Sequence, residues 1–260
     1  MSGGGRGYGL RVPEWLQAGA WGLLAGSALL IGAVAGYFAR VPRKIIASIM
    51  AFGAGVLLSA VSFDLIAEAH EQGGLLPTAI GAAGGALAYT GANVLLARRG
   101  ARHRKRSGDV QPSEQEQPGS GSAIAVGALL DGVPESVVIG ASLLAGGPVS
   151  LVTVVAVFLS NVPEGLSSAA GMRQAGRTRR YVFLLWTAIA LVSGAAALAG
   201  YTLLGGAPPE VLATITALAA GAILAMITDT MVPEAFENAH LLVGLITVLG
   251  FLVSFALSQA

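Results

Sequence analysis

The chain has 260 residues, of which 54% are hydrophobic and 11% are charged, and its formal net charge is +1. Soluble domains usually carry about 25% charged residues, so this composition excludes an ordinary soluble protein. The absence of cysteine also excludes disulfides and thiolate metal sites. We therefore predict an all-α membrane protein, in which abundant glycine and alanine allow helices to pack closely.

Eight apolar stretches are each long enough to cross a bilayer, which takes about 20 residues. They are predicted at residues 15–39, 44–66, 76–97, 122–145, 148–171, 181–204, 210–232 and 240–258. The Gly-rich start leads directly into the first stretch, so no separate signal peptide is expected. Together they predict one transmembrane domain over residues 1–260 with eight transmembrane helices.

The one long polar connection covers residues 98–121, which are basic at first and then rich in Ser, Gln, Glu, Pro and Gly. This composition predicts a disordered loop. Its basic run is also compatible with nucleic-acid binding, but no nucleic-acid partner is expected beside so many apolar stretches. The expected surroundings are the lipid bilayer.

Basic residues concentrate in three alternate connections of the eight-span arrangement. Thirteen of the 15 Lys and Arg residues lie there: Arg40, Arg43, Lys44, Arg98, Arg99, Arg102, Arg104, Lys105, Arg106, Arg173, Arg177, Arg179 and Arg180. Cytoplasmic loops of membrane proteins carry an excess of Lys and Arg. We therefore predict a multi-pass protein of the cell membrane, with this face cytoplasmic and both termini external.

Two similar polar motifs interrupt the fourth and fifth apolar stretches. They read Asp131-Gly132-Val133-Pro134-Glu135 and Ser160-Asn161-Val162-Pro163-Glu164-Gly165. Side chains four residues apart share one face of a helix, which pairs Asp131 with Glu135 and Ser160 with Glu164. A carboxylate in the middle of a bilayer costs about 2.5–3.5 kcal/mol on insertion scales. These carboxylates are therefore expected to face one another, a cation or water.

Each motif also places a proline directly before its glutamate. Proline removes a backbone donor, so the sequence predicts a kink in each helix that frees the carbonyls of Leu130 and Leu159. Interrupted helices of this kind assemble ion sites in transporters. The predicted ligands of a divalent cation are oxygen-bearing side chains: Asp131, Glu135, Ser160, Asn161 and Glu164. The alternative is two proline kinks whose polar side chains only satisfy the backbone.

Two further acidic clusters lie near the ends of the second and seventh stretches. Their deeper members are predicted to line a cation pathway: Asp64, Glu68, Asp229 and Glu234. Glu71 and Glu237 lie closer to the helix ends and are equally well explained as solvated residues. Acidic groups at both ends and in the middle would form a continuous route for a cation.

The motifs together resemble those of the ZIP (Zrt/Irt-like) family of divalent metal transporters. The family pattern His-Asn-x-Pro-Glu/Asp-Gly is similar to residues 131–136, and the pattern His/Gln-Glu/Asp-x-Pro-Glu/His-Gly is similar to residues 160–165. Residues 228–234 resemble a third signature, Asp-Glu-hydrophobic-Pro-Glu. The resemblance covers nearly the whole chain. It implies a ZIP-like bundle with kinked helices four and five at its core, and a homodimer.

The sequence departs from the family pattern at several ligand positions. Asp131 and Ser160 stand where the family has histidine, Gly132 stands for an asparagine, and Ala197 stands for an expected glutamate. Without imidazole, metal preference moves from zinc toward harder ions such as manganese, iron(II) or magnesium, although zinc also accepts carboxylates. The resemblance therefore leaves the choice of metal open.

The resemblance implies a transporter, not an enzyme, that moves zinc, iron, manganese or a similar metal into the cytoplasm. The metal would be a substrate, with no resident cofactor. Glu135 and Glu164 would bridge the ion and exchange protons as it leaves, while helices move around the site. Alternatives are a non-transporting metal sensor or membrane scaffold and a carrier of monovalent cations. An intramembrane metallohydrolase is disfavoured because the chain has no His-Glu-x-x-His pattern.

Overall fold

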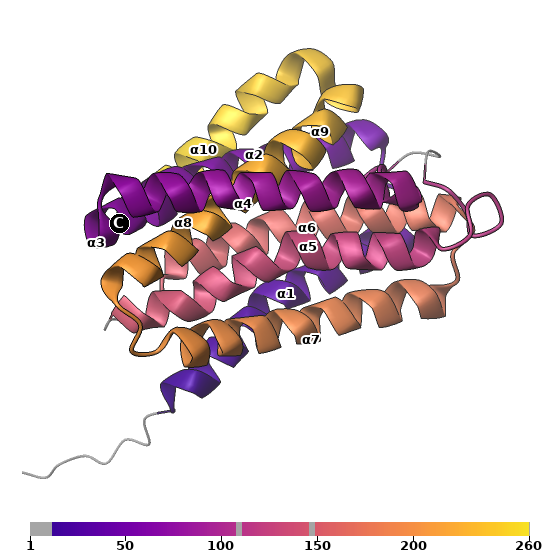
Figure 1. Ribbon diagram of the computed structural model, residues 1–260. Coiled ribbons are helices and arrows are strands. Elements are labelled where there is room, and N and C mark those ends of the chain that lie inside the picture. The colour runs from indigo at the N-terminus through magenta and orange to yellow at the C-terminus, as the bar shows by residue number, and fades with distance from the viewer. Residues whose placement is uncertain (1–11, 108–110, 146–148, 260) are drawn as a thin grey trace, which may run out of the picture.

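The computed structural model describes residues 12–107, 111–145 and 149–259, and every regular element in this part of the chain is a helix. The long helices lie side by side as one bundle (Figure 1). This arrangement confirms the all-α class and a bundle of the membrane type. It follows from the composition, because helices satisfy their own backbone hydrogen bonds where no water is available.

Most of the helices follow one another with short connections; the long one runs from the end of η2 to the start of α5. The α-helices are α1 (Glu14–Phe38), α2 (Arg43–Ala60), α3 (Ala67–Gly73), α4 (Leu75–Leu96), α5 (Ser120–Ala141), α6 (Leu151–Gln174), α7 (Arg179–Leu204), α8 (Pro209–Met226), α9 (Val232–Ala239) and α10 (Val243–Ser258). The π-helical or 3₁₀ segments are η1 (Val61–Ile66), η2 (Ala97–Ala101), η3 (Ser142–Ala145), η4 (Ile227–Met231) and η5 (His240–Leu242). Thus η1 joins α2 to α3 without a break, and η4 joins α8 to α9.

Seven helical stretches in the described residues are long and apolar enough to cross a membrane, where the sequence predicts eight. The difference lies in Pro209–Ser258, which has 50 residues and which the sequence divides into two spans. Fully helical, it would measure about 75 Å, far more than a hydrocarbon core of about 30 Å. His240, with φ 38°, breaks the stretch, and α10 then packs along α2.

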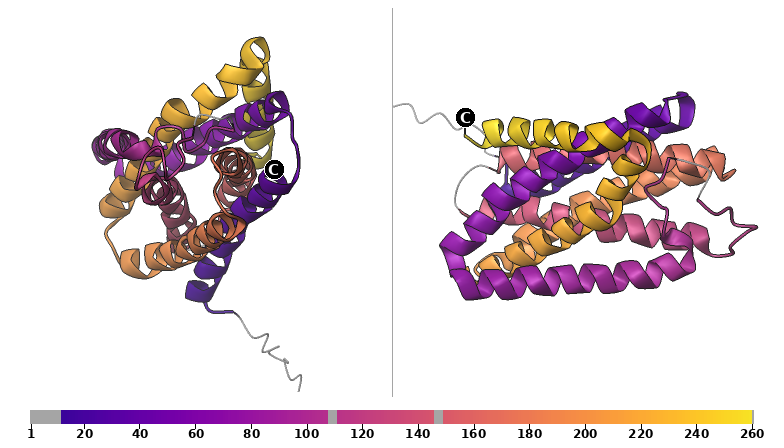
Figure 2. Two further views of the ribbon diagram at one scale, coloured as in Figure 1. Left: turned by 90° about the vertical axis from the view of Figure 1, so that its right-hand side faces the viewer. Right: turned by 90° about the horizontal axis from the view of Figure 1, so that it is seen from above.

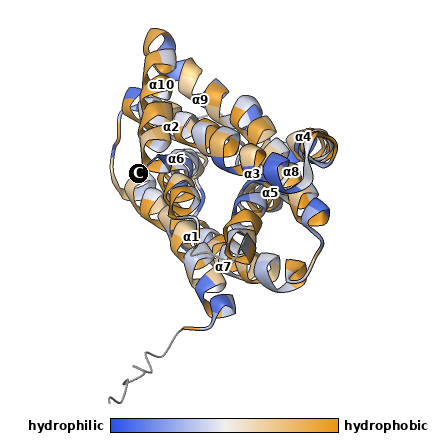
Figure 3. Ribbon diagram, turned by 90° about the vertical axis from the view of Figure 1, so that its left-hand side faces the viewer, coloured by the Kyte–Doolittle hydropathy of each residue, from blue (hydrophilic) through white to orange (hydrophobic). Residues whose placement is uncertain are grey.

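The inner faces of the helices are built from small residues, which explains their close packing. On α1 the buried side chains include Ala18, Ala25, Ala28 and Ala33, and this helix packs against α6 and α7. Seen along the bundle, α6 lies among the other helices (Figure 2). Most of the ribbon has the colour of hydrophobic residues (Figure 3), and many large hydrophobic side chains are exposed, such as Leu75, Leu87 and Leu203. A lipid-facing surface requires this distribution.

Three basic connections lie at one end of the bundle, which we call the loop end because it carries the connection between α4 and α5. Arg173 after the buried part of α6 donates to the carbonyl of Tyr37 at 2.9 Å, and Gln174 donates to that of Ser107 at 3.1 Å. The opposite end, called the far end, holds the start of α1 and the end of α10. There Ser258 donates to Asp64 at 2.9 Å.

Pro134 and Pro163 lie inside α5 and α6, and each helix continues on both sides of its proline. The kinks expected at these prolines stay a prediction. The two motifs nevertheless fall near the middle of two long helices that follow each other in the chain. This position brings their carboxylates into the interior of the bundle, which the next section describes.

Candidate cation-binding site

The α5 motif turns both of its carboxylates into the protein. Asp131 and Glu135 are each only 2% exposed, as expected for residues one helical turn apart on the inner face. Ser136, which follows Glu135, donates its hydroxyl back to the Gly132 carbonyl at 2.7 Å. The predicted shared face of Asp131 and Glu135 is therefore present in the structure.

The polar side chains of the α6 motif make two kinds of contact, one with charged side chains and one with backbone carbonyls. Glu164 is 4% exposed and faces the α5 carboxylates through shared charged partners. Ser160 instead donates to the Val157 carbonyl at 2.9 Å, and Asn161 donates to the Ala25 carbonyl of α1 at 3.0 Å. Of the five predicted ligands, Asp131 and Glu164 therefore share one charged partner, and Glu135 lies within electrostatic reach of both. Ser160 and Asn161 satisfy the backbone.

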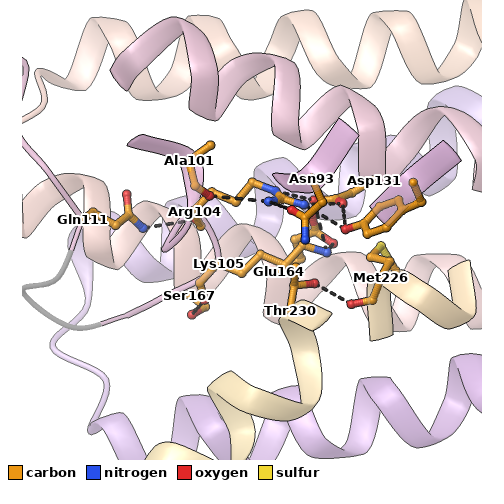
Figure 4. A network of polar contacts seen from close by, with 11 residues as sticks. Asn93, Ala101, Arg104, Lys105, Gln111, Asp131, Glu164, Ser167, Met226 and Thr230 are labelled. Carbon is orange, nitrogen blue, oxygen red and sulfur yellow. Dashed lines mark hydrogen bonds and ion pairs between the residues drawn. The ribbon is translucent and has the colours of Figure 1, made fainter. Parts of the chain in front are cut away.

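The α5–α6 carboxylates are met by basic residues from the chain itself. Residues 104–106, Arg104-Lys105-Arg106, are called the cationic segment here, and they follow η2. Figure 4 shows Arg104 and Lys105 beside Asp131 and Glu164. Arg104 binds Asp131 with two hydrogen bonds, from Nε at 3.0 Å and from Nη2 at 2.9 Å. Such a bidentate pair is the strongest geometry available to these two groups.

Arg104 is held by α4 as well as by α5. Its Nη1 donates to Asn93 at 2.7 Å, and its Nη2 donates to the Tyr89 hydroxyl at 2.8 Å. Tyr89 in turn donates to Asp131 at 2.7 Å. Asn93 and Tyr89 are four residues apart and share one face of α4, so a single helix face completes this network.

Lys105 stands between the two motifs. Its Nζ lies 2.7 Å from Glu164 Oε2 and 3.4 Å from Asp131 Oδ2, and the lysine is 3% exposed. One ammonium group thus links a carboxylate of α5 to a carboxylate of α6. A cation shared by both motifs would occupy the same position between these two oxygens.

Glu234 of α9 forms the outermost part of the site at the loop end. Glu234 is 1% exposed. It accepts a hydrogen bond from the backbone N–H of Ser107 at 3.0 Å and another from the Ser107 hydroxyl at 2.8 Å. Arg106 lies 3.5 Å from Glu234 and also forms an ion pair with Glu237. Every basic residue of the cationic segment therefore faces at least one carboxylate.

The backbone of the cationic segment is fixed by neutral side chains. Ser167 of α6 donates to the Lys105 carbonyl at 2.5 Å, and Gln111 donates to the Arg106 and Arg104 carbonyls at 2.8 and 3.2 Å. The sequence predicts a disordered loop over residues 98–121, whereas the described parts of this loop fold onto the bundle. The reason is that buried carboxylates supply the partners which a polar, basic segment lacks on its own.

The acidic half of the loop is fixed separately. Glu114 accepts a hydrogen bond from Arg177 at 2.6 Å and from the N–H groups of Gly119 and Gly121, next to the start of α5. The Arg177 hydrogen bond and these two backbone donors lower the pKa of Glu114 to about 2. This carboxylate therefore anchors the loop as an anion at any physiological pH.

Glu135 differs from its two acidic neighbours. Its Oε1 is buried and has no hydrogen-bond partner among the described residues, although Glu164, Lys105 and Asp131 lie within electrostatic reach. Buried polar atoms without a partner are rare and require an explanation, such as an absent ion, water or proton. Glu234 Oε2 is also without a hydrogen bond among the described residues, but it lies 3.5 Å from Arg106, whereas no ion pair is seen for Glu135 in the same part of the chain.

The remaining pathway candidates lie away from this network. Asp64 in η1 and Glu68 in α3 are at the far end, where Glu68 accepts from Gln72 at 2.8 Å. Glu68 also lines a cavity of about 220 Å³ between α3, α5 and α8. Asp229 lies in η4 and is exposed, so the structure does not bring it to the buried carboxylates.

Within the described residues, no three His, Asp or Glu side chains are placed to hold one metal ion. Arg104 and Lys105 stand against the oxygens of Asp131 and Glu164 instead. The two basic side chains carry two positive charges, as a divalent cation does. The donor set itself consists of hard carboxylate oxygens that suit such an ion.

Sequence reasoning missed the partners of the carboxylates: Tyr89, Asn93, Arg104, Lys105 and Ser167. Two signals in the sequence point to them. Three consecutive basic residues follow a span that has a Tyr and an Asn four residues apart near its end. Three buried carboxylates also require counter-charges, which are scarce in a chain with so few charged residues.

Comparison with protein-family models found no matching family, and comparison with curated proteins found no match. The class of protein is therefore defined by the fold alone. It is an all-helical protein of the membrane type, with buried carboxylates near the middle of two helices that follow each other in the chain.

Proposed function

We propose that the protein is a membrane transporter that moves divalent metal cations into the cytoplasm. The observation that carries the proposal is the meeting of Asp131 and Glu164, from two polar motifs on two helices, around one positively charged group. Buried carboxylates are retained in membrane helices where they bind or conduct cations. The resemblance of both motifs to the ZIP family supports the same function.

In this proposal, Pro209–Ser258 forms two spans, which gives eight in all. The loop end is cytoplasmic because the basic connections gather there, and both termini are external. A cation would approach from the far end, past Asp64 and Glu68, and reach the carboxylates of α5 and α6. Glu234 would then lead it to the cytoplasm. A homodimer, as the resemblance implies, is part of the same proposal.

Glu135 completes the proposed metal site. Its buried oxygen without a described partner is available to an incoming ion, while Asp131 and Glu164 supply the other carboxylates. An all-oxygen set favours manganese or iron(II), and it also accepts zinc. Carboxylates must lose their protons to bind a metal, so Glu135 and Glu164 would exchange protons for the ion.

Uptake into liposomes tests the proposal. The purified protein is reconstituted, and influx of manganese, iron(II), zinc and magnesium is followed with an internal metal-sensitive dye. Glu164→Gln removes a site charge with little change in size, and we expect uptake to fall at least about a hundredfold. Glu210→Gln, an exposed carboxylate at the start of α8, is the matched control and should transport at the parent rate. Equal uptake by the parent and Glu164→Gln would overturn the proposal.

A non-transporting metal sensor or scaffold is the second candidate. The specific observation in its favour is the charge pairing itself, because Arg104 and Lys105 already neutralise Asp131 and Glu164. Binding without uptake distinguishes the two candidates. A protein that binds manganese in detergent but gives no influx into liposomes is a sensor or scaffold, and one that does both is a transporter.

A further inference from the structure

We propose that the cationic segment, Arg104-Lys105-Arg106, is a displaceable plug that competes with the metal for the carboxylates of Asp131 and Glu164. The inference rests on the proposed function and adds a regulatory part to the same site. In the plugged state, the chain's own side chains supply the positive charge that the metal would supply. The metal reaches both motifs only when the plug withdraws toward the loop end.

The two inner residues of the plug have different roles. Arg104 is fixed by Asp131, Tyr89 and Asn93, with four hydrogen bonds between 2.7 and 3.0 Å. Among the described residues, the Lys105 ammonium group has its two carboxylate contacts, at 2.7 and 3.4 Å, and no further polar contact. Arg104 is therefore the anchor, and Lys105 is the group that an incoming metal displaces first.

The plug also closes the loop end of the proposed pathway. Ser107 and Arg106 bind Glu234, a buried carboxylate of α9. A metal that leaves the buried carboxylates in this direction meets the backbone of residues 104–107, which Ser167 and Gln111 hold in place. Opening the path requires these bonds to break together, so metal passage and plug release are coupled.

Two glycines on α5 and α6 make room for the plug. A Cβ atom at Gly127 would lie 2.5 Å from Cδ of Arg104, and one at Gly171 would lie 2.1 Å from the Arg106 carbonyl oxygen. Real Cβ atoms do not approach other atoms so closely. The three atoms nearest to a Cβ at Gly171 all belong to Arg106 and Gln111 of the loop, so a methyl group there pushes the plug out without altering any charge.

These glycines provide a test that leaves every carboxylate and every basic residue intact. The test is titration of the detergent-purified protein with manganese, comparing the parent with Gly171→Ala. We expect the mutation to raise manganese affinity about tenfold, because the plugged fraction no longer opposes binding. Gly84→Ala on α4 is the matched control, since a Cβ there meets nothing within 4 Å. It should leave the affinity unchanged.

Lys105→Gln is the second variant and should also raise manganese affinity, with Arg102→Gln, an exposed position in the same loop, as its control. Parent-level affinity in both Gly171→Ala and Lys105→Gln would overturn the plug while leaving the proposed function standing. If neither the parent nor these variants bind manganese, zinc or iron(II), the proposed function fails as well. Metal binding by these two variants but not by the parent would support both the plug and the proposed function.

The position of the plug can also be measured directly, by cysteine labelling, so that the test does not depend on a change in protein stability. Ser107→Cys places a single thiol in this cysteine-free chain at a site that is 1% exposed. We expect slow maleimide labelling without metal and labelling at least about tenfold faster with saturating manganese. The same cysteine combined with Glu164→Gln should show no manganese effect. A labelling rate that stays constant while manganese binds would overturn the inference.

Discussion

The carboxylates at the two ends of the bundle have different partners. At the loop end and in the middle, Asp131, Glu164 and Glu234 face the basic residues of the cationic segment. At the far end, Asp64 and Glu68 accept hydrogen bonds from the neutral side chains of Ser258 and Gln72. Paired charges stabilise a closed arrangement, whereas acids with neutral partners keep their attraction for a cation from solution.

This difference makes the two ends of the bundle electrostatically unequal. The cavity of about 220 Å³ that Glu68 lines lies at the far end, where negative charge is not neutralised by a described ion pair. At the loop end, the cationic segment occupies the space between the helices. A cation that reaches the far end is therefore attracted, and one that reaches the loop end meets positive charge. The contrast makes definite predictions, beginning with the largest effect.

The largest expected effect is that of Asp131→Asn. It leaves the Arg104 guanidinium, which is 2% exposed, without its bidentate partner and weakens the hold on Lys105. Removing one partner of a buried ion pair costs about 3–5 kcal/mol. We expect a clear fall in melting temperature in detergent. The far-end counterpart, Asp64→Asn, loses only a neutral hydrogen bond and should cost about 1 kcal/mol. Equal losses of stability in Asp131→Asn and Asp64→Asn would contradict the proposed difference between the two ends.

A second prediction separates Glu164 from Glu135. Glu164→Gln removes the closest partner of Lys105, so the metal-free protein should lose about 3 kcal/mol. Glu135→Gln removes a charge that has an unpartnered buried oxygen, so metal-free stability should stay equal or rise. Both variants should lose manganese binding. Thermal melting without metal decides the point, and the same fall in both variants would mean that the two glutamates are stabilised alike.

The fold class and the central carboxylates could be predicted from the sequence, because apolar length and spacing act locally. Twenty apolar residues predict a span wherever they occur, and a spacing of four places Asp131 and Glu135 on one helix face. The motif residues Ser160 and Asn161 show the limit of that reasoning. Their type suits a metal, but a buried hydroxyl and a buried amide bind the nearest free carbonyls, those of Val157 and Ala25.

The docked loop could not be predicted from local composition. Residues 98–121 have the low hydrophobicity and high charge of a disordered segment, and in isolation nothing opposes disorder. Their position depends on Asp131, Glu164 and Glu234, which come from three different helices. Charge balance over the whole bundle predicts it better, since buried carboxylates require counter-charges.

The third prediction concerns access from the far end. Asp64→Asn and Glu68→Gln remove half-buried charges beside the far-end opening, which should weaken the local attraction for cations without touching the central site. We expect the KM for manganese uptake to rise about threefold to tenfold, with an unchanged maximal rate. Glu14→Gln, an exposed far-end carboxylate that binds Tyr201, is the control and should leave KM unchanged. Unaltered uptake in both variants would remove the far-end acids from the pathway.

The smallest expected effect is a pH dependence of the docked loop that arises from His103. Burial, and then the positive charges of Arg106 and Arg102, lower the pKa of His103 below 6.5, while Glu234 acts in the opposite direction. The released loop therefore takes up a proton at a higher pH than the docked loop. Docking is at full strength above pH 6.5 and weakens as the pH falls below it.

Labelling of a cysteine at position 107 measures this change. Between pH 7.5 and 5.5, the labelling rate, corrected for the thiol's own ionisation with a model thiol, should rise about twofold to threefold as protonation of His103 favours release. His103→Gln, which carries no titrating group, should abolish the rise while leaving the rate at pH 7.5 nearly unchanged. A fall in the corrected rate at low pH would show that protonation strengthens docking. In that case Glu234 would outweigh burial and the two arginines, and the loop end would tighten in acid where we expect it to loosen.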